Sequence, residues 1–405
     1  MLAFVVNQFP RQVDAYFLRE LSGLARRGLD FRLYSLLPPP RGWAVHRDAE
    51  ALLDRTIYPP PPLALLRRAA TTTLGRPGSA AAAAARIVWG HRRQPSALAK
   101  SLAVLPQSLA FAADMRRRGV RHIHANWATY PATAAFLVSR LTGIPFSFSG
   151  HATDIFVHRA MLPEKIAAAR FVLTCTQFNR RYLASVSPER SEAIETIYHG
   201  VDLARFAPNG AERDPDLLLS VGTLRRCKGF DDLIRAVALL RERGRSLRLE
   251  IIGEGEERPA LERLIAQLEL GDRVELAGYR PQEEVIPRYR RAAAVVLPAH
   301  LEDHFGIPNI LIEALAAGAP VVCTSLPSLG ELVEHERSGL FVPERDPGAI
   351  ASAVERVLED PLWARRLADE GRRRVRERFD MERTTAQLAE RLAAAVEAGP
   401  RRALS

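Results

Sequence analysis

Lysine is scarce in this chain. Only Lys100, Lys165 and Lys228 occur among its 57 cationic residues, so the formal net charge of +10 comes almost entirely from arginine. The basic residues form short clusters without interleaved aromatic side chains, unlike the basic stripes of single-strand binders. We therefore expect no nucleic-acid partner, and we attribute the charge to an anionic substrate or to anionic lipid.

Cysteine is equally rare. Cys175, Cys227 and Cys323 lie far apart and have no metal-ligand spacing, which disfavours a disulfide framework and a zinc site. His122 and His124 alternate along a predicted strand without a carboxylate partner at metal spacing. The sequence thus predicts neither a metal nor another cofactor.

Long apolar runs are also missing. No window approaches the roughly 20 uncharged apolar residues of a membrane span. The start, MLAFVVNQFPRQ, lacks the charged head and apolar run of a secretion signal. We expect a cytoplasmic protein that spans no membrane.

Short apolar runs do alternate with amphipathic helical stretches, and this alternation occurs twice along the 405 residues. It is typical of α/β proteins with parallel sheets covered by helices. We predict two Rossmann-like, doubly wound domains at residues 1–205 and 206–380, followed by a helix at 381–405 that returns toward the first domain. A cleft between two such domains is the expected substrate site.

Residues 59–105 interrupt the alternation with a proline run, arginine pairs and an alanine tract. We interpret this segment as a helical insertion into the first domain. A packed helix is the simpler reading of its composition. The alternative is a basic amphipathic surface that rests on an anionic membrane near a lipid-linked acceptor.

The segment SVGTLRRCKGFDDLIRA combines a strand, Gly222, a basic loop and Lys228 at the start of a helix. A strand-to-helix turn presents free N–H groups, and a nearby ammonium completes a diphosphate site. An ordinary solvated lysine is the alternative. Because the chain uses arginine almost everywhere else, a lysine at this turn favours the specific role.

A second segment places Glu313 inside a predicted helix among apolar neighbours, after a loop with Gly306 and Pro308. A carboxylate is seldom embedded in such surroundings without a function. At the carboxyl end of a parallel strand, it lies where a nucleotide ribose would bind. Two other patterns are weaker: Asp214-Pro215-Asp216 has DxD spacing but falls in a predicted linker, and Gly253-Glu254-Gly255 lacks the third glycine of a dinucleotide fingerprint.

With these two segments, the sequence resembles the retaining GT-B glycosyltransferases of family 4, of the exopolysaccharide and colanic-acid type. The matching segments include SVGTLRRCKGFDDLIRA, IIGEGEERPALERLI, GIPNILIEALAAGAPVV and ELVEHERSGLFV in the second half, and HIHANWATYPATAAFLVSRLTGIPFSFSGHATDIF in the first. The resemblance covers nearly the whole chain and is weakest from about residue 40 to residue 100.

The resemblance implies donor contacts by position. Lys228 matches the lysine that neutralises the donor diphosphate, and Glu313 matches the glutamate that binds the ribose hydroxyls. The remaining donor-site candidates are Gly222, Thr223, Arg225, Arg226, Tyr279, Arg280, Phe305, Gly306 and Ile307. Tyr279 and Arg280 would bracket the base, and Gly306 and Ile307 would approach the sugar and phosphate.

In the first domain the resemblance implies two catalytic residues, His151, which reaches toward the transferred sugar, and Asp154 close by. Two positions depart from the family pattern. Phe305 replaces an acid that contacts a sugar hydroxyl, and Thr223 replaces an arginine that assists the lysine. Glu302 or Asp303, and Arg225 or Arg226, are candidate substitutes because they lie in the same loops.

We therefore predict a hexosyltransferase-type enzyme that moves a sugar from a nucleoside-diphosphate sugar to a glycan, a lipid-linked acceptor or a small molecule, with retention. Peripheral attachment to the inner face of the membrane is compatible with this prediction. Phe305 and Thr223 keep a second reading open, a nucleotide-sugar-binding protein with a degenerate site. A third reading is another GT-B enzyme, such as a nucleotide-sugar epimerase.

Overall fold

The computed structural model describes residues 1–405 except 11–14, 40–46, 93, 304–305 and 401–405. The chain divides into two compact units. Unit 1 comprises residues 1–198 and 382–405, and unit 2 comprises residues 199–381. Each unit is built around one parallel sheet.

Unit 1 contains a seven-stranded parallel sheet in the order β3-β2-β1-β4-β5-β6-β7. Its strands are β1 (Leu2–Gln8), β2 (Phe31–Leu37), β3 (Thr56–Ile57), β4 (His122–Asn126), β5 (Phe146–Gly150), β6 (Val172–Thr174) and β7 (Ile194–Thr196). Side chains of β1 alternate between two buried layers, with Phe4 in one and Val5 in the other. This period of two is what a sheet covered on both faces requires.

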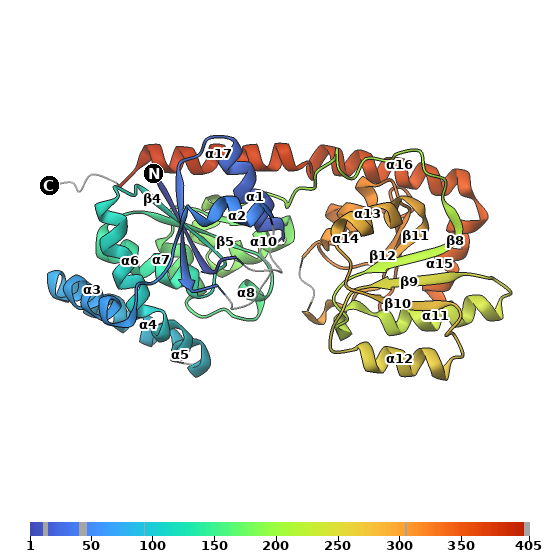
Figure 1. Cartoon of the computed structure of the whole chain (residues 1–405), viewed down its shortest axis with the longest axis horizontal. Coiled ribbons are helices and arrows are strands. Elements are labelled where there is room, and N and C mark those ends of the chain that lie inside the picture. Colours follow the sequence, from blue (N-terminus) through green and yellow to red (C-terminus); the bar gives the residue numbers. More distant parts are fainter. Residues whose placement is uncertain (11–14, 40–46, 93, 304–305, 401–405) are drawn as a thin grey trace. The chain divides into compact units, whose positions relative to one another are not determined.

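Helices cover both faces of this sheet. Those of the unit outside the insertion are α1 (Ala15–Arg26), α2 (Arg47–Leu53), α6 (Leu105–Arg117), α7 (Tyr130–Thr142), α8 (Thr153–Phe156), α9 (Leu162–Ala168), α10 (Gln177–Val186) and α17 (Met381–Ala398). Leu21 of α1 and Leu392 of α17 belong to one apolar layer, while α6 and α7 fill the other. The last helix therefore packs on unit 1, as Figure 1 shows in red.

The segment 59–105 folds as three helices, α3 (Pro62–Gly75), α4 (Pro77–His91) and α5 (Pro95–Ala103). Each begins with a proline, which fits the first turn because its missing N–H would have no helical partner there. Figure 1 shows α3 and α4 outside α6 and α7, on which they pack.

No single helix in the described ranges is long and apolar enough to cross a membrane. The pair α5 and α6, bent by 41°, meets the requirement by length and composition when taken together. Within that pair, α6 is largely buried in the core of unit 1. The finding therefore fits a core helix better than a span.

Unit 2 contains a six-stranded parallel sheet in the order β10-β9-β8-β11-β12-β13. Its strands are β8 (Asp214–Val221), β9 (Arg248–Ile252), β10 (Val274–Gly278), β11 (Ala292–Leu297), β12 (Val321–Thr324) and β13 (Leu340–Val342). Its helices are α11 (Phe230–Glu242), α12 (Arg258–Gln267), α13 (Gln282–Arg291), α14 (Asn309–Ala316), α15 (Pro347–Glu359) and α16 (Pro361–Arg378). Parallel strands joined by helices confirm the predicted α/β class in both units.

One local prediction is wrong. Asp214-Pro215-Asp216 lies in β8 and not in a linker, and the Asp214 carboxylate pairs with Arg248 at 2.6 Å. The turn-forming residues at the start of this segment favoured a linker in the sequence, although they begin a strand whose first half is only partly buried.

Candidate functional site

Loops at the carboxyl ends of β8, β9 and β10 form one side of the predicted donor site, and their backbones are in direct contact. The Leu224 N–H donates to the carbonyl of Glu254 at 2.9 Å, and the Gly253 N–H donates to Gly278 at 2.9 Å. A Cβ on Gly253, whose φ is +149°, would lie 1.9 Å from the carbonyl oxygen of Gly222. Close approach of two loops therefore explains this glycine, without a dinucleotide fingerprint.

Lys228 ends the 3-10 turn Arg226–Lys228 and precedes Gly229, whose φ of +66° leads into α11. Its Cδ and Cε lie 3.8 Å from where a Cβ on Gly222 would stand, so the aliphatic chain packs on that glycine. Burial lowers the pKa of Lys228, and the charge of Arg225 lowers it further. An anion bound beside these two cations would offset these effects, because an opposite charge favours the protonated form of Lys228.

The other residues of the first loop are exposed. Thr223, Arg225 and Arg226 all face solvent, and the Arg225 N–H donates to the Thr223 carbonyl at 2.7 Å. Of these three residues, Arg225 is the one whose charge lowers the pKa of Lys228. Of the two predicted substitutes for the missing arginine at Thr223, Arg225 therefore has the better position, and its role stays a prediction.

A buried polar pair that the sequence interpretation missed lies beside the turn that carries Lys228. His300 Nε2 and Asp232 Oδ2 are 2.8 Å apart, and the His300 N–H donates to the carbonyl of Cys227 at 2.8 Å. A Cβ on Gly229 would lie 2.0 Å from the carbonyl oxygen of Pro298. The start of α11 is thus fixed against the loop that follows β11.

Glu313 lies one turn into α14, between buried Ile312 and Ala314. Its Oε1 accepts a hydrogen bond from Gln282 Nε2 at 2.8 Å, and its Oε2 accepts one from the Tyr289 hydroxyl at 3.3 Å. Burial raises the pKa of Tyr289 well above its usual range, and the carboxylate of Glu313 adds to the rise. Both donors come from α13 and orient the carboxylate as a hydrogen-bond acceptor.

The remaining predicted donor contacts lie in loops. Tyr279 is 68% exposed and Arg280 is exposed, both directly after β10. The carbonyl of Gly306 accepts a hydrogen bond from Ser328 Oγ at 3.0 Å, and Ile307 is half-buried. Phe305 lies outside the described residues, so its predicted departure from the family pattern stays a prediction.

These residues surround the point where the strand order of the sheet reverses. β8 has β9 on one side and β11 on the other, so the chain extends the sheet from β8 in one direction as far as β10 and then in the opposite direction from β11. Lys228 follows β8, and Glu313 lies on the helix that follows β11. Such a switch point, outside the carboxyl ends of parallel strands, is where α/β proteins bind nucleotides.

In unit 1, His151 follows β5 and is 8% exposed. The Oδ1 of Asp154 accepts the N–H groups of His151 at 3.0 Å and Ala152 at 2.9 Å, and its Oδ2 accepts that of Ala128 at 2.8 Å. The Trp127 ring, on a residue with a φ of +88°, lies 5.0 Å from the His151 ring. These are the contacts of a positioning residue, and the catalytic roles expected of His151 and Asp154 stay predictions.

His122 and His124 belong to a buried row of hydrogen bonds. Ser147 Oγ lies 2.7 Å from His122 Nε2 and 2.8 Å from His124 Nδ1, and Ser149 Oγ lies 2.9 Å from His124 Nε2. Burial lowers the pKa of His122 to about 2 and that of His124 to about 3, so both rings are neutral near pH 7. No group of three or more His, Cys, Asp or Glu residues in the described ranges has the arrangement of a metal site.

Two family models together match almost the whole chain. The model for Glycosyltransferase Family 4 matches residues 13–205, and the model for Glycosyl transferases group 1 matches residues 203–374. A D-inositol 3-phosphate glycosyltransferase of Frankia alni is 32% identical over 64% of this chain and 72% of its own length. A glycogen synthase of Mycobacterium tuberculosis is 30% identical over 68% of each chain. A putative colanic acid biosynthesis glycosyltransferase of Escherichia coli, WcaL, is 38% identical over 40% of this chain and 41% of its own.

Solved structures share the fold at low sequence identity. Anabaena Alr3699/HepE in complex with UDP has a TM-score of 0.71 at 17% identity, covering 97% of this chain and 100% of that one. Sucrose-phosphate synthase of Thermosynechococcus elongatus has a TM-score of 0.73 at 22% identity, covering 98% and 99%. The chain therefore belongs to glycosyltransferase family 4, and it is a GT-B glycosyltransferase that acts on nucleotide sugars.

Proposed function

We propose that this enzyme binds its nucleoside-diphosphate sugar at the switch point of unit 2 and transfers the sugar to a glycan acceptor. One observation carries the proposal. Lys228 and Arg225 place two positive charges after β8, and Glu313 presents an oriented carboxylate after β11. Diphosphate and ribose hydroxyls are the groups that match this pair of sites.

Charge on the leaving nucleoside diphosphate increases as its bond to the anomeric carbon breaks. Lys228, together with Arg225, stabilises that charge, which is the usual task of fixed cations in group transfer. Asp231 and Asp232 already complement the helix dipole in the first turn of α11. The side-chain cations therefore do most of this work, and the proposal requires no divalent metal.

The names of the relatives suggest the kind of donor and acceptor. Anabaena Alr3699/HepE was crystallised with UDP and with UDP-glucose. Two relatives are named for colanic acid and amylovoran biosynthesis, the second being AmsK of Erwinia amylovora, 31% identical over 58% of each chain. We propose a UDP-sugar donor and an exopolysaccharide acceptor, with retention of anomeric configuration as the resemblance implies.

Replacing Glu313 with alanine is expected to weaken nucleotide binding about tenfold or more, because the two ribose hydroxyls lose their hydrogen bonds to a charged acceptor. Thermal shift with UDP, GDP and ADP measures this, since a bound ligand raises the melting temperature. The wild type is expected to respond most strongly to UDP. Glu262→Ala, an exposed carboxylate on α12, is the matched control. Equal UDP affinity in the two variants would rule out the ribose role.

We also propose that α3 and α4 rest on the anionic inner face of the membrane. The sequence contains no acidic residue between Asp54 and Asp114, whereas arginine recurs throughout. Leu63, Leu66 and Leu74 of α3 are 74%, 61% and 78% exposed, and their spacing puts them on one helical stripe. Apolar stripes beside cations are the pattern of helices that lie in the lipid interface.

The variant Leu63→Ser/Leu66→Ser/Leu74→Ser is expected to bind vesicles of phosphatidylglycerol and phosphatidylcholine at least tenfold more weakly than the wild type. Co-sedimentation measures this. The exposed leucines contribute little to folding, so the melting temperature should hardly change. Leu362→Ser, which alters a 72% exposed leucine of unit 2, is the control. If the triple variant and the control bind alike, α3 is not the membrane contact.

A further inference from the structure

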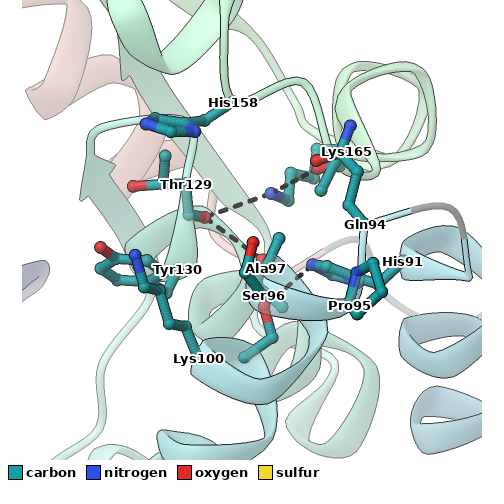
Figure 2. A pocket seen from close by; sticks show the side chains of 13 residues that line it. His91, Gln94, Pro95, Ser96, Ala97, Lys100, Thr129, Tyr130, His158 and Lys165 are labelled. Carbon is teal, nitrogen blue, oxygen red and sulfur yellow. Dashed lines mark hydrogen bonds between the residues drawn. The ribbon is translucent and has the colours of Figure 1, made fainter.

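A pocket of about 390 Å³ lies in unit 1, between the insertion helices and the loop that follows β4 (Figure 2). One wall comes from the end of α4 and from α5, and another from the start of α7. The segment 158–165 closes the pocket from a third direction. Figure 2 shows Lys100, Tyr130 and His158 on one side of this space and His91 and Gln94 on the other.

The lining of this pocket is positively charged. Lys100 and Lys165 both belong to it, and none of the thirteen lining residues carries a carboxylate. Burial lowers the pKa of His91, whose ring lies 2.9 Å from Ser101 Oγ, so it adds no charge near neutral pH. Of the nearby acids, Glu164 is exposed on the surface and Asp154 accepts three backbone N–H groups. An anionic ligand fits this charge distribution.

Two helix starts add to the positive potential. α5 has nine residues and α7 has thirteen, and residues of the first turn of each line the pocket. Neither helix is capped by the side chain of its N-cap residue, Gln94 for α5 and Thr129 for α7. Uncapped amino-terminal ends and a lysine are the groups that bind phosphate in proteins.

Lys165 connects the pocket to the loop around His151. Its Nζ is fully buried and donates to the carbonyls of Ala128 at 2.7 Å, Ala160 at 3.0 Å and Thr129 at 3.1 Å. Burial lowers its pKa to about 7, while the nearby carboxylates of Asp154 and Glu164 favour the protonated form. The Ala128 peptide is thus held by Lys165 at its carbonyl and by Asp154 at its N–H. A group bound in the pocket would lie next to the loop that carries Trp127.

We propose that this pocket binds the phosphate group of the acceptor. The inference rests on the proposed function, because it assigns the acceptor to unit 1. The phosphate group would belong either to a lipid-linked acceptor or to a soluble sugar phosphate. Both present anionic phosphate oxygens to Lys100 and to the two helix starts.

The test measures binding of pyrophosphate, farnesyl diphosphate and farnesol by isothermal titration calorimetry. A Lys228→Ala background removes the lysine that would bind diphosphate in unit 2. Lys100 is exposed, so Lys100→Gln should fold normally, and we expect it to weaken farnesyl diphosphate binding about tenfold. Arg86→Gln, an exposed cation of α4 outside the pocket lining, is the matched control and should bind as the background does.

Each outcome has a distinct meaning. Tighter binding of farnesyl diphosphate than of pyrophosphate, with both weakened by Lys100→Gln, indicates a lipid-linked acceptor. Equal binding of the two indicates a soluble phosphorylated acceptor. Absence of binding, equal losses in Lys100→Gln and Arg86→Gln, or equal binding of farnesol overturns the proposal. Failure of the donor assignment shows separately, as a wild type that does not bind UDP.

Discussion

Replacing Lys228 with alanine is expected to lower kcat/KM for the nucleotide sugar about 100- to 1,000-fold. Lys228 ends a 3-10 turn before α11, and its aliphatic chain packs on Gly222. His300, which pairs with Asp232, donates its backbone N–H to Cys227 in the same turn. A cation fixed in this way stabilises the leaving diphosphate most when its charge is greatest, in the transition state. Loss of one preorganised group of this kind typically lowers the rate by about this factor.

Steady-state kinetics with varied donor measures this effect and separates turnover from binding. We expect a lower kcat and a higher KM, since the diphosphate is charged in both the ground state and the transition state. Arg235→Ala removes an exposed cation farther along α11 and serves as the control. Unchanged kcat/KM in Lys228→Ala would rule out Lys228 as the residue that binds the donor diphosphate. A smaller loss in Arg225→Ala, not additive with that of Lys228→Ala, would show that the two cations act together.

The architecture was predictable from the sequence because parallel strands buried on both faces have a strong pattern. The apolar run Leu2–Val6 and the helical spacing of Phe17, Leu21 and Leu24 depend only on neighbours in the sequence. The start of β8 was not predictable in this way, since Pro215 and two aspartates look like a turn. The first residues of β8 are partly exposed, and Arg248 of the next strand pairs with Asp214.

The donor residues were predictable because they lie within sequence motifs of the family. The residues that position them lie outside such motifs and were not predictable. His300 and Asp232 lie 68 positions apart, and Glu313 takes its donors from 31 and 24 positions away. Nothing local in a sequence pairs such groups. Burial makes these pairings necessary, because a buried polar atom without a hydrogen-bond partner lowers the stability of the fold.

The scarcity of lysine is a signal that extends beyond Lys228. The scarcity of lysine favoured a special role for Lys228, and the same reasoning applies to Lys165 and Lys100. The structure places Lys165 at the centre of a buried set of carbonyl acceptors and Lys100 at the rim of the same pocket. Burial therefore acts on the ammonium groups of Lys165 and Lys228, while Lys100 is exposed at the pocket rim.

The resemblance predicts a catalytic role for Asp154 beside His151, whereas its hydrogen bonds favour a structural role. It accepts three backbone N–H groups, and its charge favours the protonated form of Lys165. Asp154→Ala would leave these amides without their acceptor inside the protein, where one lost partner costs about 1–3 kcal/mol. It would also remove a carboxylate near a buried ammonium. We expect the free energy of unfolding of unit 1 to fall by about 3–5 kcal/mol.

Differential scanning calorimetry measures this loss, and Asp54→Ala, at an exposed position of the same unit, should leave the unfolding transition unchanged. Asp154→Asn retains one side-chain oxygen as acceptor, so its stability should lie between those of the wild type and the alanine variant. UDP binding should persist in all three variants, because the donor residues belong to unit 2. An Asp154→Asn enzyme with wild-type stability and no transfer would contradict the positioning role and would instead place Asp154 among the catalytic residues.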